Sequence, residues 1–396
     1  MGTKLIVFLF ALCAGLVAIG VGAMDMPYHP PKPYDLQTLY KQAKVDCHPK
    51  DWPCIENTLY GFTMTYGPKA AVDTFKLLKD RGDIPPTIDA HHVVHHIGHH
   101  TAMAFGSNTQ AFMLCPPDFD YGCQHGFFQY AISSGGLTEA AAISMCENLQ
   151  KDPSVLSKTK YECYHGFGHG VMMHEDHDLK KSLDVCDRLK SPTGQDGCWQ
   201  GVFMENVDVA EEGQWQKGMF SMQDPLAPCD NMDAKYQHEC YINHSGWLMR
   251  FYGNDFGRGA QACLKAYAAM VDTCLQTLGL LATNSAWQLA LLQSAYKPDL
   301  GGNAWKLCKK FPHGYVGRCV LSALDNLMNS TTVDAPLILR AQSFCQVVSA
   351  QFRADCYKQI GLDLRYLTPD RKAAHDACLF LQGDPEQHQC LSTVGT

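Results

Sequence analysis

The sequence predicts an all-α protein, a solenoid-like array of disulfide-stapled helical hairpin repeats. Two observations support this fold class. The cysteines after residue 23 fall into adjacent pairs, and from Cys123 onward the second members of successive pairs recur every 34 to 45 residues. A period in the thirties to forties is typical of repeats built from two helices. Apolar-rich stretches such as 161–173 and 319–328 follow the second cysteines, and we expect each to be the next helix.

The N-terminal stretch has the features of an export signal. Lys4 precedes an apolar run from Leu5 to about Val21, and small residues follow at the cleavage positions. Residues 1–23 are therefore expected to be a signal peptide, with an uncleaved anchor as the alternative. Residues 24–46, which include a Pro-rich stretch, are expected to be a linker. No later segment reaches the roughly 18 apolar residues that span a bilayer, so we expect a secreted or periplasmic protein without a membrane span in the mature chain.

Length and charge narrow the possible functions. The 396 residues suit two domains or one extended array. The net charge of -8 gives no basic patch that could hold a phosphate backbone, so we do not expect a nucleic-acid partner.

The cysteine spacing predicts the disulfide pattern. Without Cys13, which lies in the apolar run, 18 cysteines remain, and an even number in an exported chain favours disulfides. Neighbouring cysteines form these pairs: Cys47 and Cys54, Cys115 and Cys123, Cys146 and Cys163, Cys186 and Cys198, Cys229 and Cys240, Cys263 and Cys274, Cys308 and Cys319, Cys345 and Cys356, Cys378 and Cys390. Each pair is expected to join the end of one helix to the start of the next, although bridges within one hairpin are an alternative.

Histidines are concentrated in one part of the chain. Of 18 histidines, 11 lie between residues 91 and 177. The pairs His95/His99 and His165/His169 have the i, i+4 spacing that places two imidazoles on one face of a helix, where both can bind a single metal ion. His125 occupies the equivalent place in a third segment, in which Gln129 replaces the second histidine. We therefore predict a transition-metal site formed by His95, His99, His125, His165 and His169.

Equivalent positions of successive repeats line up in rows on a helical array. One row is His95, His125, His165 and Gln200, and the next is His99, Gln129, His169 and Met204. Two separate metal sites, or a pair of sites bridged through His125, are both compatible with these rows. His174 and His177 are expected in a solvated loop, and a surface role is expected for Glu205.

The kind of metal follows from the available ligands. Imidazole suits zinc, copper, iron and nickel, and methionines lie near the predicted site at Met172, Met173 and Met204. Because every mature cysteine is assigned to a disulfide, a zinc-thiolate site is not expected. Copper or iron is therefore favoured over zinc. We assign the site to helical repeats over residues 47–228. Residues 229–396, where the cysteine spacing continues without the paired histidine pattern, are assigned to structural or partner-binding repeats.

Two resemblances to known families add to these expectations. The Cys-x-x-Gly segments 123–126, 163–166 and 198–201 resemble the helix starts of Sel1-like repeat proteins, which implies the repeat architecture and no particular activity. The segments 92–96 and 96–100 are similar to the histidine boxes of the membrane fatty-acid desaturase and hydroxylase class, which hold two irons. That likeness implies oxygen chemistry.

Two hypotheses about function remain after these observations. The first is an exported metalloprotein that, in its stronger form, is a metal-dependent oxidoreductase with open coordination positions. The second is an extracytoplasmic interaction scaffold that binds another protein through its repeat surface and has no catalytic activity. No residue pattern identifies a catalytic nucleophile or a phosphate-binding loop.

Overall fold

The structure is a computed structural model that describes residues 30–48, 51–85, 88–210, 213, 219–292, 300–328 and 333–395. The predicted signal peptide lies outside these residues. Within them, all regular secondary structure is helical and no strand is present, which confirms the all-α prediction. In the same part of the chain, every helix is too short or too polar to cross a membrane.

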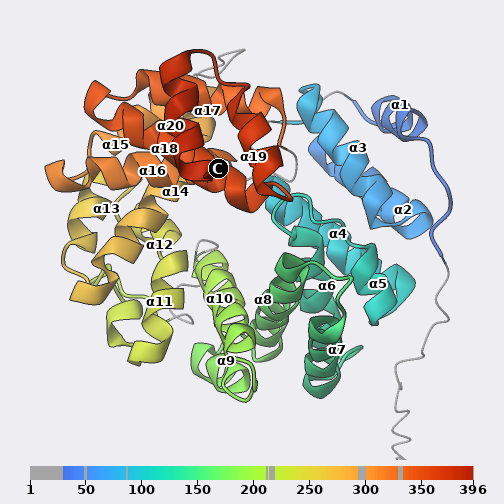
Figure 1. Ribbon diagram of the computed structural model, residues 1–396. Coiled ribbons are helices and arrows are strands. Elements are labelled where there is room, and N and C mark those ends of the chain that lie inside the picture. The colour runs from blue at the N-terminus through green and yellow to red at the C-terminus, as the bar shows by residue number, and fades with distance from the viewer. Residues whose placement is uncertain are drawn as a thin grey trace, which may run out of the picture.

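One set of helices, which we call the first row, follows the chain in sequence, and each member contacts the next (Figure 1). The row curves into an arc. Its members are α2 (Trp52–Tyr66), α4 (Ala90–Phe105), α6 (Gly122–Ser133), α8 (Ser157–His174), α10 (Pro192–Val209), α11 (Ala234–Asn243), α14 (Val271–Leu292), α16 (Val316–Met328), α18 (Ala350–Leu367) and α20 (Asp384–Val394).

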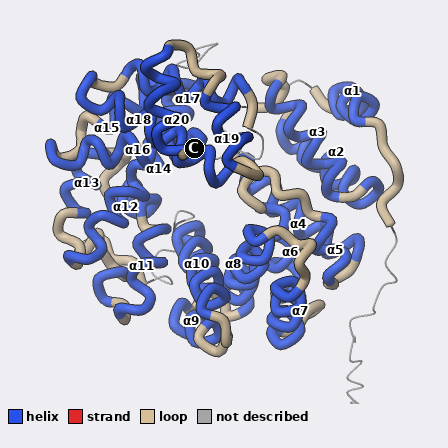
Figure 2. The backbone as a smooth tube through the Cα atoms, in the orientation of Figure 1, coloured by secondary structure: helices blue, strands red, loops and turns tan. Residues whose placement is uncertain are grey.

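The chain alternates between the first row and a second row of shorter helices, and the connecting loops are mostly short (Figure 2). The second row comprises α1 (Leu36–Asp46), α3 (Pro68–Asp80), α5 (Thr109–Leu114), α7 (Glu139–Lys151), α9 (Leu179–Cys186), α13 (Phe256–Cys263), α15 (Leu300–Cys308), α17 (Ala335–Val347) and α19 (Arg371–Cys378). Helix α12 (Ser245–Phe251) and the 3-10 turns η2 (Cys229–Asn231), η3 (Ala268–Met270) and η4 (His313–Tyr315) complete the described connections.

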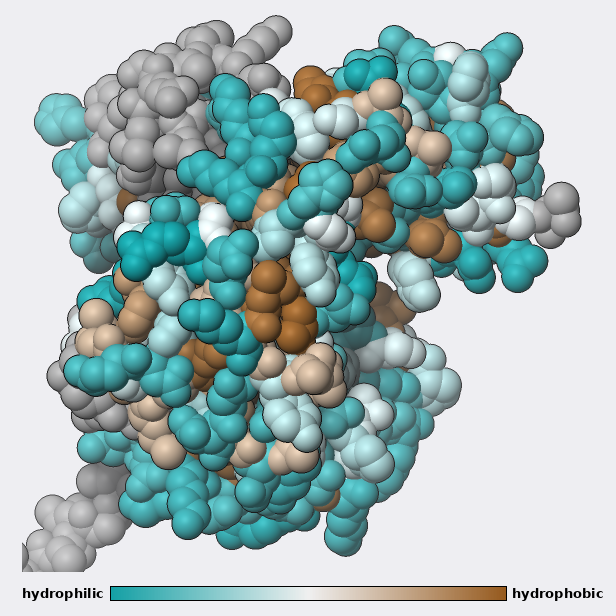
Figure 3. Space-filling view, turned by 90° about the vertical axis from the view of Figure 1, so that its left-hand side faces the viewer, coloured by the Kyte–Doolittle hydropathy of each residue, from teal (hydrophilic) through white to brown (hydrophobic). Residues whose placement is uncertain are grey.

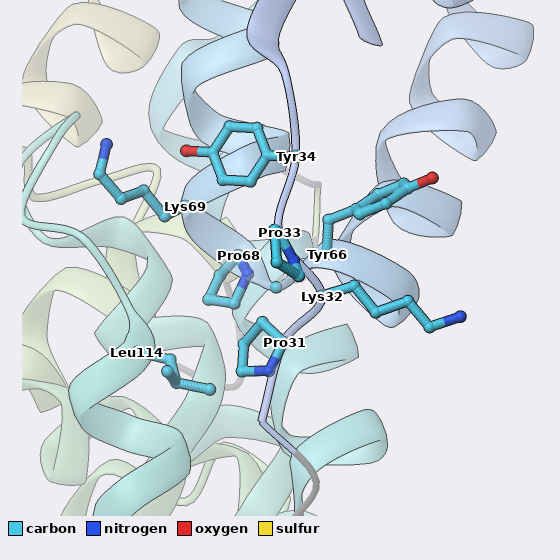
Figure 4. Close-up of a pocket in the computed structure, with 9 residues that line it drawn as sticks. Pro31, Lys32, Pro33, Tyr34, Tyr66, Pro68, Lys69 and Leu114 are labelled. Atoms are coloured by element: carbon cyan, nitrogen blue, oxygen red, sulfur yellow. The ribbon is translucent and has the colours of Figure 1, made fainter.

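The predicted linker is shorter than expected, because part of it is helix α1. Asp35 caps this helix by accepting a hydrogen bond from the backbone N–H of Thr38 at 2.8 Å. The Pro-rich segment before α1 packs on the junction of α2 and α3. There it lines a pocket of about 380 Å³ with Tyr66 and Leu114 (Figure 4). The hydroxyl of Tyr34 donates to Asp73 on α3 at 2.7 Å, so this segment is tied to the helical body.

The nine predicted disulfides between neighbouring cysteines are all present, with Cα–Cα distances between 5.4 and 5.8 Å. In most units the bond joins the end of a second-row helix to the first turns of the following first-row helix, as Cys308 of α15 and Cys319 of α16 do. The unit made of α3 and α4 has no disulfide. Each bond therefore fixes how one helix of a unit lies on the other.

The hydrophobic core follows the helices as one continuous cluster from Leu39 in α1 to Val394 in α20. A second, smaller cluster surrounds the fully buried Trp247 of α12. Figure 3 shows that the face it presents is largely hydrophilic and carries hydrophobic side chains in small patches. An extended core of this kind is typical of proteins whose repeats contact mainly their neighbours.

Glycines allow helices of the first row to approach each other closely around the histidines. A Cβ atom added at Gly126 of α6 would overlap the carbonyl oxygen of His95 on α4, and one added at Gly98 would overlap that of Cys123. Helices α8 and α10 repeat this arrangement at Gly168 and Gly201. Any larger residue would force these backbones apart, so the glycines of the repeated motifs set the short distances between helices.

Candidate metal centre

Three consecutive first-row helices, α4, α6 and α8, bring four of the five histidines predicted as ligands into one buried cluster. The exposed fraction is 4% for His95, 2% for His125, 4% for His165 and 0% for His169. The ring centroids of His95 and His169 lie 5.4 Å apart although their helices are two positions apart in the row. The row therefore curves tightly enough for α4 and α8 to share a site, which the sequence could not decide.

The first predicted row of side chains exists. The rings of His95 and His125 lie 5.4 Å apart, those of His125 and His165 lie 4.5 Å apart, and Gln200 contacts His165. The second predicted row of side chains ends at a different residue from the one predicted. There Glu205 of α10, rather than Met204, contacts His169.

Gln129 determines the tautomers of two histidines. Its amide nitrogen donates to the Glu205 carboxylate at 2.7 Å, so its amide oxygen is the atom that faces His95 and His99. An oxygen of this kind only accepts hydrogen bonds, so Nδ1 of His95 and Nε2 of His99 must both carry a hydrogen. In the neutral imidazole of His95, Nε2 therefore carries the lone pair.

The same reasoning applies to His165 and His169. Nδ1 of His165 lies 3.1 Å from the amide oxygen of Gln200, and Nδ1 of His169 lies 2.9 Å from Oε2 of Glu205. Tyr161 donates its hydroxyl to the same Gln200 oxygen at 2.7 Å, which fixes the orientation of that amide. Both Nδ1 atoms therefore donate outward. In the neutral form of both rings, the two Nε2 atoms, which lie 3.1 Å apart, face each other with lone pairs.

His125 lies between the other histidines. Its Nε2 is 3.0 Å from Oε2 of Glu162, while its Nδ1 is buried without a hydrogen-bond partner. When Glu162 is a carboxylate, Nε2 donates and Nδ1 presents a lone pair to the cluster. A buried nitrogen without a partner is unfavourable, and a metal ion would satisfy it.

The nitrogens form two groups, each compact enough to bind an ion. His91, His95 and His125 form one triad, and His125, His165 and His169 form the other, with the ligand atoms of each within 4.8 Å of one another. His91 was not predicted as a ligand, although it lies four residues before His95 on the same helix face. His99, a predicted ligand, lies outside both triads, and its Nε2 donates to Gln129.

Burial sets the charges in the cluster. It lowers the pKa values of His95, His125 and His165 well below the usual range, and neighbouring imidazoles lower them further. These rings are therefore neutral at neutral pH, which is the state that binds metal. Burial raises the pKa of Glu162 to about 7. Burial also opposes ionisation of Glu205, but hydrogen bonds from His169 and Gln129, together with the nearby His177, outweigh it and lower its pKa to about 2.

Two expectations about nearby residues are corrected. The surface role for Glu205 is wrong, since this residue is buried and accepts hydrogen bonds from two helices. His174 is exposed as expected, but the side chain of His177 is only 20% exposed and its Nε2 lies 3.7 Å from Glu205. The sequence could have indicated that Glu205 is buried, because it lies seven residues after Cys198 on the helix that follows the predicted ligands.

Scans of the chain against protein-family models, curated proteins and solved structures found no match. The function of the centre is therefore inferred from its geometry and chemistry.

Proposed function

We propose that this protein is an extracytoplasmic metalloprotein that binds a transition-metal ion on His125, His165 and His169. These three residues lie on α6 and α8, and all three are fully or almost fully buried. The remaining predicted ligands, His95 and His99, belong to the same layer of side chains, in which His99 supports Gln129.

The observation that carries the proposal is the pair of Nε2 atoms 3.1 Å apart, which turn their lone pairs toward each other when both rings are neutral. Two lone pairs at this distance repel unless a cation lies between or beside them. A proton could bridge them, but burial lowers the pKa of His165 well below its usual range and so disfavours a proton on that ring. A metal ion supplies the positive charge and accepts both lone pairs.

The surrounding hydrogen bonds support the same conclusion. In metal sites a ligating histidine almost always donates its other ring N–H to a carboxylate, a carbonyl oxygen or water. His165 and His169 follow this pattern with Gln200 and Glu205. These partners orient the rings and make the Nε2 atoms better ligands.

Three imidazole ligands leave at least one coordination position open, as in catalytic metal sites. All-imidazole ligation without thiolate suits copper, iron, nickel or zinc, and affinity for divalent ions of this series is highest for copper. We favour copper or iron, with which an open position would support a metal-dependent oxidoreductase. The reacting substrate would approach at that position.

The compartment and architecture belong to the same proposal. Nine disulfides indicate an oxidising environment, so we infer a secreted or periplasmic protein. Each unit consists of one helix from each row. We regard the successive units as a solenoid-like array that holds the centre between α4 and α10.

Metal analysis of the full chain, purified without a histidine tag, tests the proposal. The chain is exported, loaded with Cu(II), Fe(II) or Zn(II) in separate samples, freed of excess metal and analysed for metal content. We expect the wild type to retain metal and His165→Ala/His169→Ala to lose about one equivalent relative to it. Circular dichroism checks that the variant is folded, which the disulfides should ensure.

The matched control is His313→Ala/His375→Ala, which removes two exposed histidines far along the chain. Its metal content should equal that of the wild type. If the wild type retains no metal, or if the His165/His169 variant retains as much as the wild type, the interaction scaffold becomes the better hypothesis.

A further inference from the structure

His91 of α4 is oriented as a ligand by an unusual stretch of backbone. Its Nδ1 lies 2.9 Å from the carbonyl oxygen of Phe119, which only accepts hydrogen bonds, so Nδ1 donates and Nε2 carries the lone pair. Phe119, Asp120 and Tyr121 all have left-handed backbone conformations, with φ values of 55°, 53° and 60°. Such strain in three consecutive non-glycine residues is maintained where a fold needs a particular geometry. Here it presents a carbonyl group to His91.

His91 and His95 reproduce the arrangement of His165 and His169. Their Nε2 atoms lie 2.9 Å apart, and both Nδ1–H groups are donated elsewhere, to Phe119 and to Gln129. Two lone pairs again face each other inside the protein. Neither histidine is a ligand of the ion proposed above, so a cation bound by this second pair would be a separate one.

A single ion could not satisfy both pairs. Metal–nitrogen distances of 2.0–2.1 Å limit two ligand atoms on one ion to a separation of about 4.2 Å. Among the described residues, the histidine groups that fit within 4.8 Å are the two triads, and they have only His125 in common. Among these residues no group of three or more combines histidines of α4 with those of α8, so the two pairs would hold different ions.

We infer that the centre binds two transition-metal ions, the second on His91 and His95, with His125 between the two positions. This inference rests on the metal binding proposed for His165 and His169 and adds a second site to it. Neighbouring ions in two-metal sites lie about 3.5–4 Å apart and bind one small ligand jointly. Gln129 and Glu205 connect the two positions, since Gln129 contacts both His95 and Glu205, and Glu205 contacts His169.

Native mass spectrometry of the full chain titrated with Cu(II), and with Zn(II) as a second probe, counts the ions on each folded molecule. We expect two ions on the wild type and on the control His313→Ala/His375→Ala. One ion should remain on His91→Ala/His95→Ala and one on His165→Ala/His169→Ala. Because His91 is only half-buried, His91→Gln can replace the first double variant if that variant does not fold, and it should weaken one of the two binding steps at least tenfold.

The possible outcomes separate this inference from the proposed function. One ion on the wild type, lost in the His165/His169 variant, would overturn the second site and leave the proposed function intact. Two ions on a His91/His95 variant would also overturn it. A wild type that binds no ion would overturn both.

Discussion

Gln129 of α6 donates its amide hydrogen to Oε2 of Glu205 on α10 at 2.7 Å, across the histidine cluster. Glu205 accepts a second hydrogen bond from His169 through the same oxygen. One buried amide and one buried carboxylate therefore determine which nitrogens of His95 and His169 face inward. The orientation of the proposed ligands therefore depends on hydrogen bonds to these two residues.

Replacing Gln129 with Leu should weaken metal binding without removing a ligand. His95 and His99 would lose their acceptor and Glu205 would lose a donor, so we expect metal affinity to fall about 10- to 100-fold. The free energy of unfolding should fall by roughly 2–3 kcal/mol because buried groups lose their partners. Calorimetric metal titration and denaturant unfolding measure the two effects. Gln124→Leu, a buried amide on the same helix whose oxygen has no partner, is the control and should change neither strongly.

Replacing Gly201 with Ala should separate α8 from α10. The added methyl group would overlap the carbonyl oxygen of His165, a backbone atom that cannot move aside alone. We expect a loss of roughly 1–3 kcal/mol in unfolding free energy and weaker metal binding. Gly61→Ala in α2 is the opposite case. Nothing lies within 4 Å of its added Cβ, so it should stabilise the protein by about 0.5–1 kcal/mol. Equal effects of the two changes would contradict the close-approach role.

His244 should make stability depend on pH. Burial lowers its pKa to about 4, while the unfolded chain binds the proton near 6.5. Between these values the unfolded state holds more protons, so the unfolding free energy falls as pH falls, by up to about 3 kcal/mol at pH 4. His244→Gln keeps a donor for the carbonyl oxygen of Pro225 but cannot titrate. Denaturant unfolding at several pH values should show a shallower slope for this variant, and the exposed His238→Gln should match the wild type.

Asp363 should destabilise the fold at neutral and higher pH. Burial, followed by the nearby charge of Asp325, raises its pKa to about 8. The pKa of Asp363 is higher in the folded state than in the unfolded state. Its favourable contribution to the unfolding free energy is therefore complete below about pH 3.8 and is lost as pH rises through about 8. Asp363→Asn should therefore raise the unfolding free energy by roughly 1–3 kcal/mol at pH 8 and little at pH 4. Asp355→Asn, an exposed change on the same helix, should have almost no effect, and an equal gain there would contradict the assignment.

Removing the Cys345–Cys356 disulfide should reduce stability and leave the metal centre intact. The bond closes a separation of 11 residues between α17 and α18, far from the histidines along the chain. Replacing both cysteines with Ser should cost roughly 2–3 kcal/mol. Metal stoichiometry should stay at the wild-type value. Loss of metal from this folded variant would contradict the assignment of the C-terminal repeats to a structural role.

The sequence correctly predicted that the chain is all-helical and which cysteines are paired, and the reason is physical. Local cysteine pairs and a regular period reflect contacts between neighbours in the chain, such as Cys263 with Cys274. It also predicted that His95, His125, His165 and His169 lie together, because i, i+4 spacing and repeat register place them on equivalent faces.

Contacts between distant helices were not predictable in the same way. The tight curvature that brings His95 to His169 depends on close approach at glycines such as Gly126, and the sequence shows the glycine without showing its neighbour. The burial of Glu205 and the hydrogen bond that occupies His99 depend on the same packing. His91 could have been predicted as a candidate ligand, because residues 91, 95 and 99 follow one another at intervals of four residues.

The disulfides join only near neighbours, with sequence separations from 7 to 17. A chain that emerges from its N-terminus can therefore oxidise each pair before the next pair becomes accessible. An enzyme that simply joins cysteines in their order of appearance would produce the native set, without a later isomerase step. Maturation in this order would complete the four helices around the histidines before the last third of the chain had emerged.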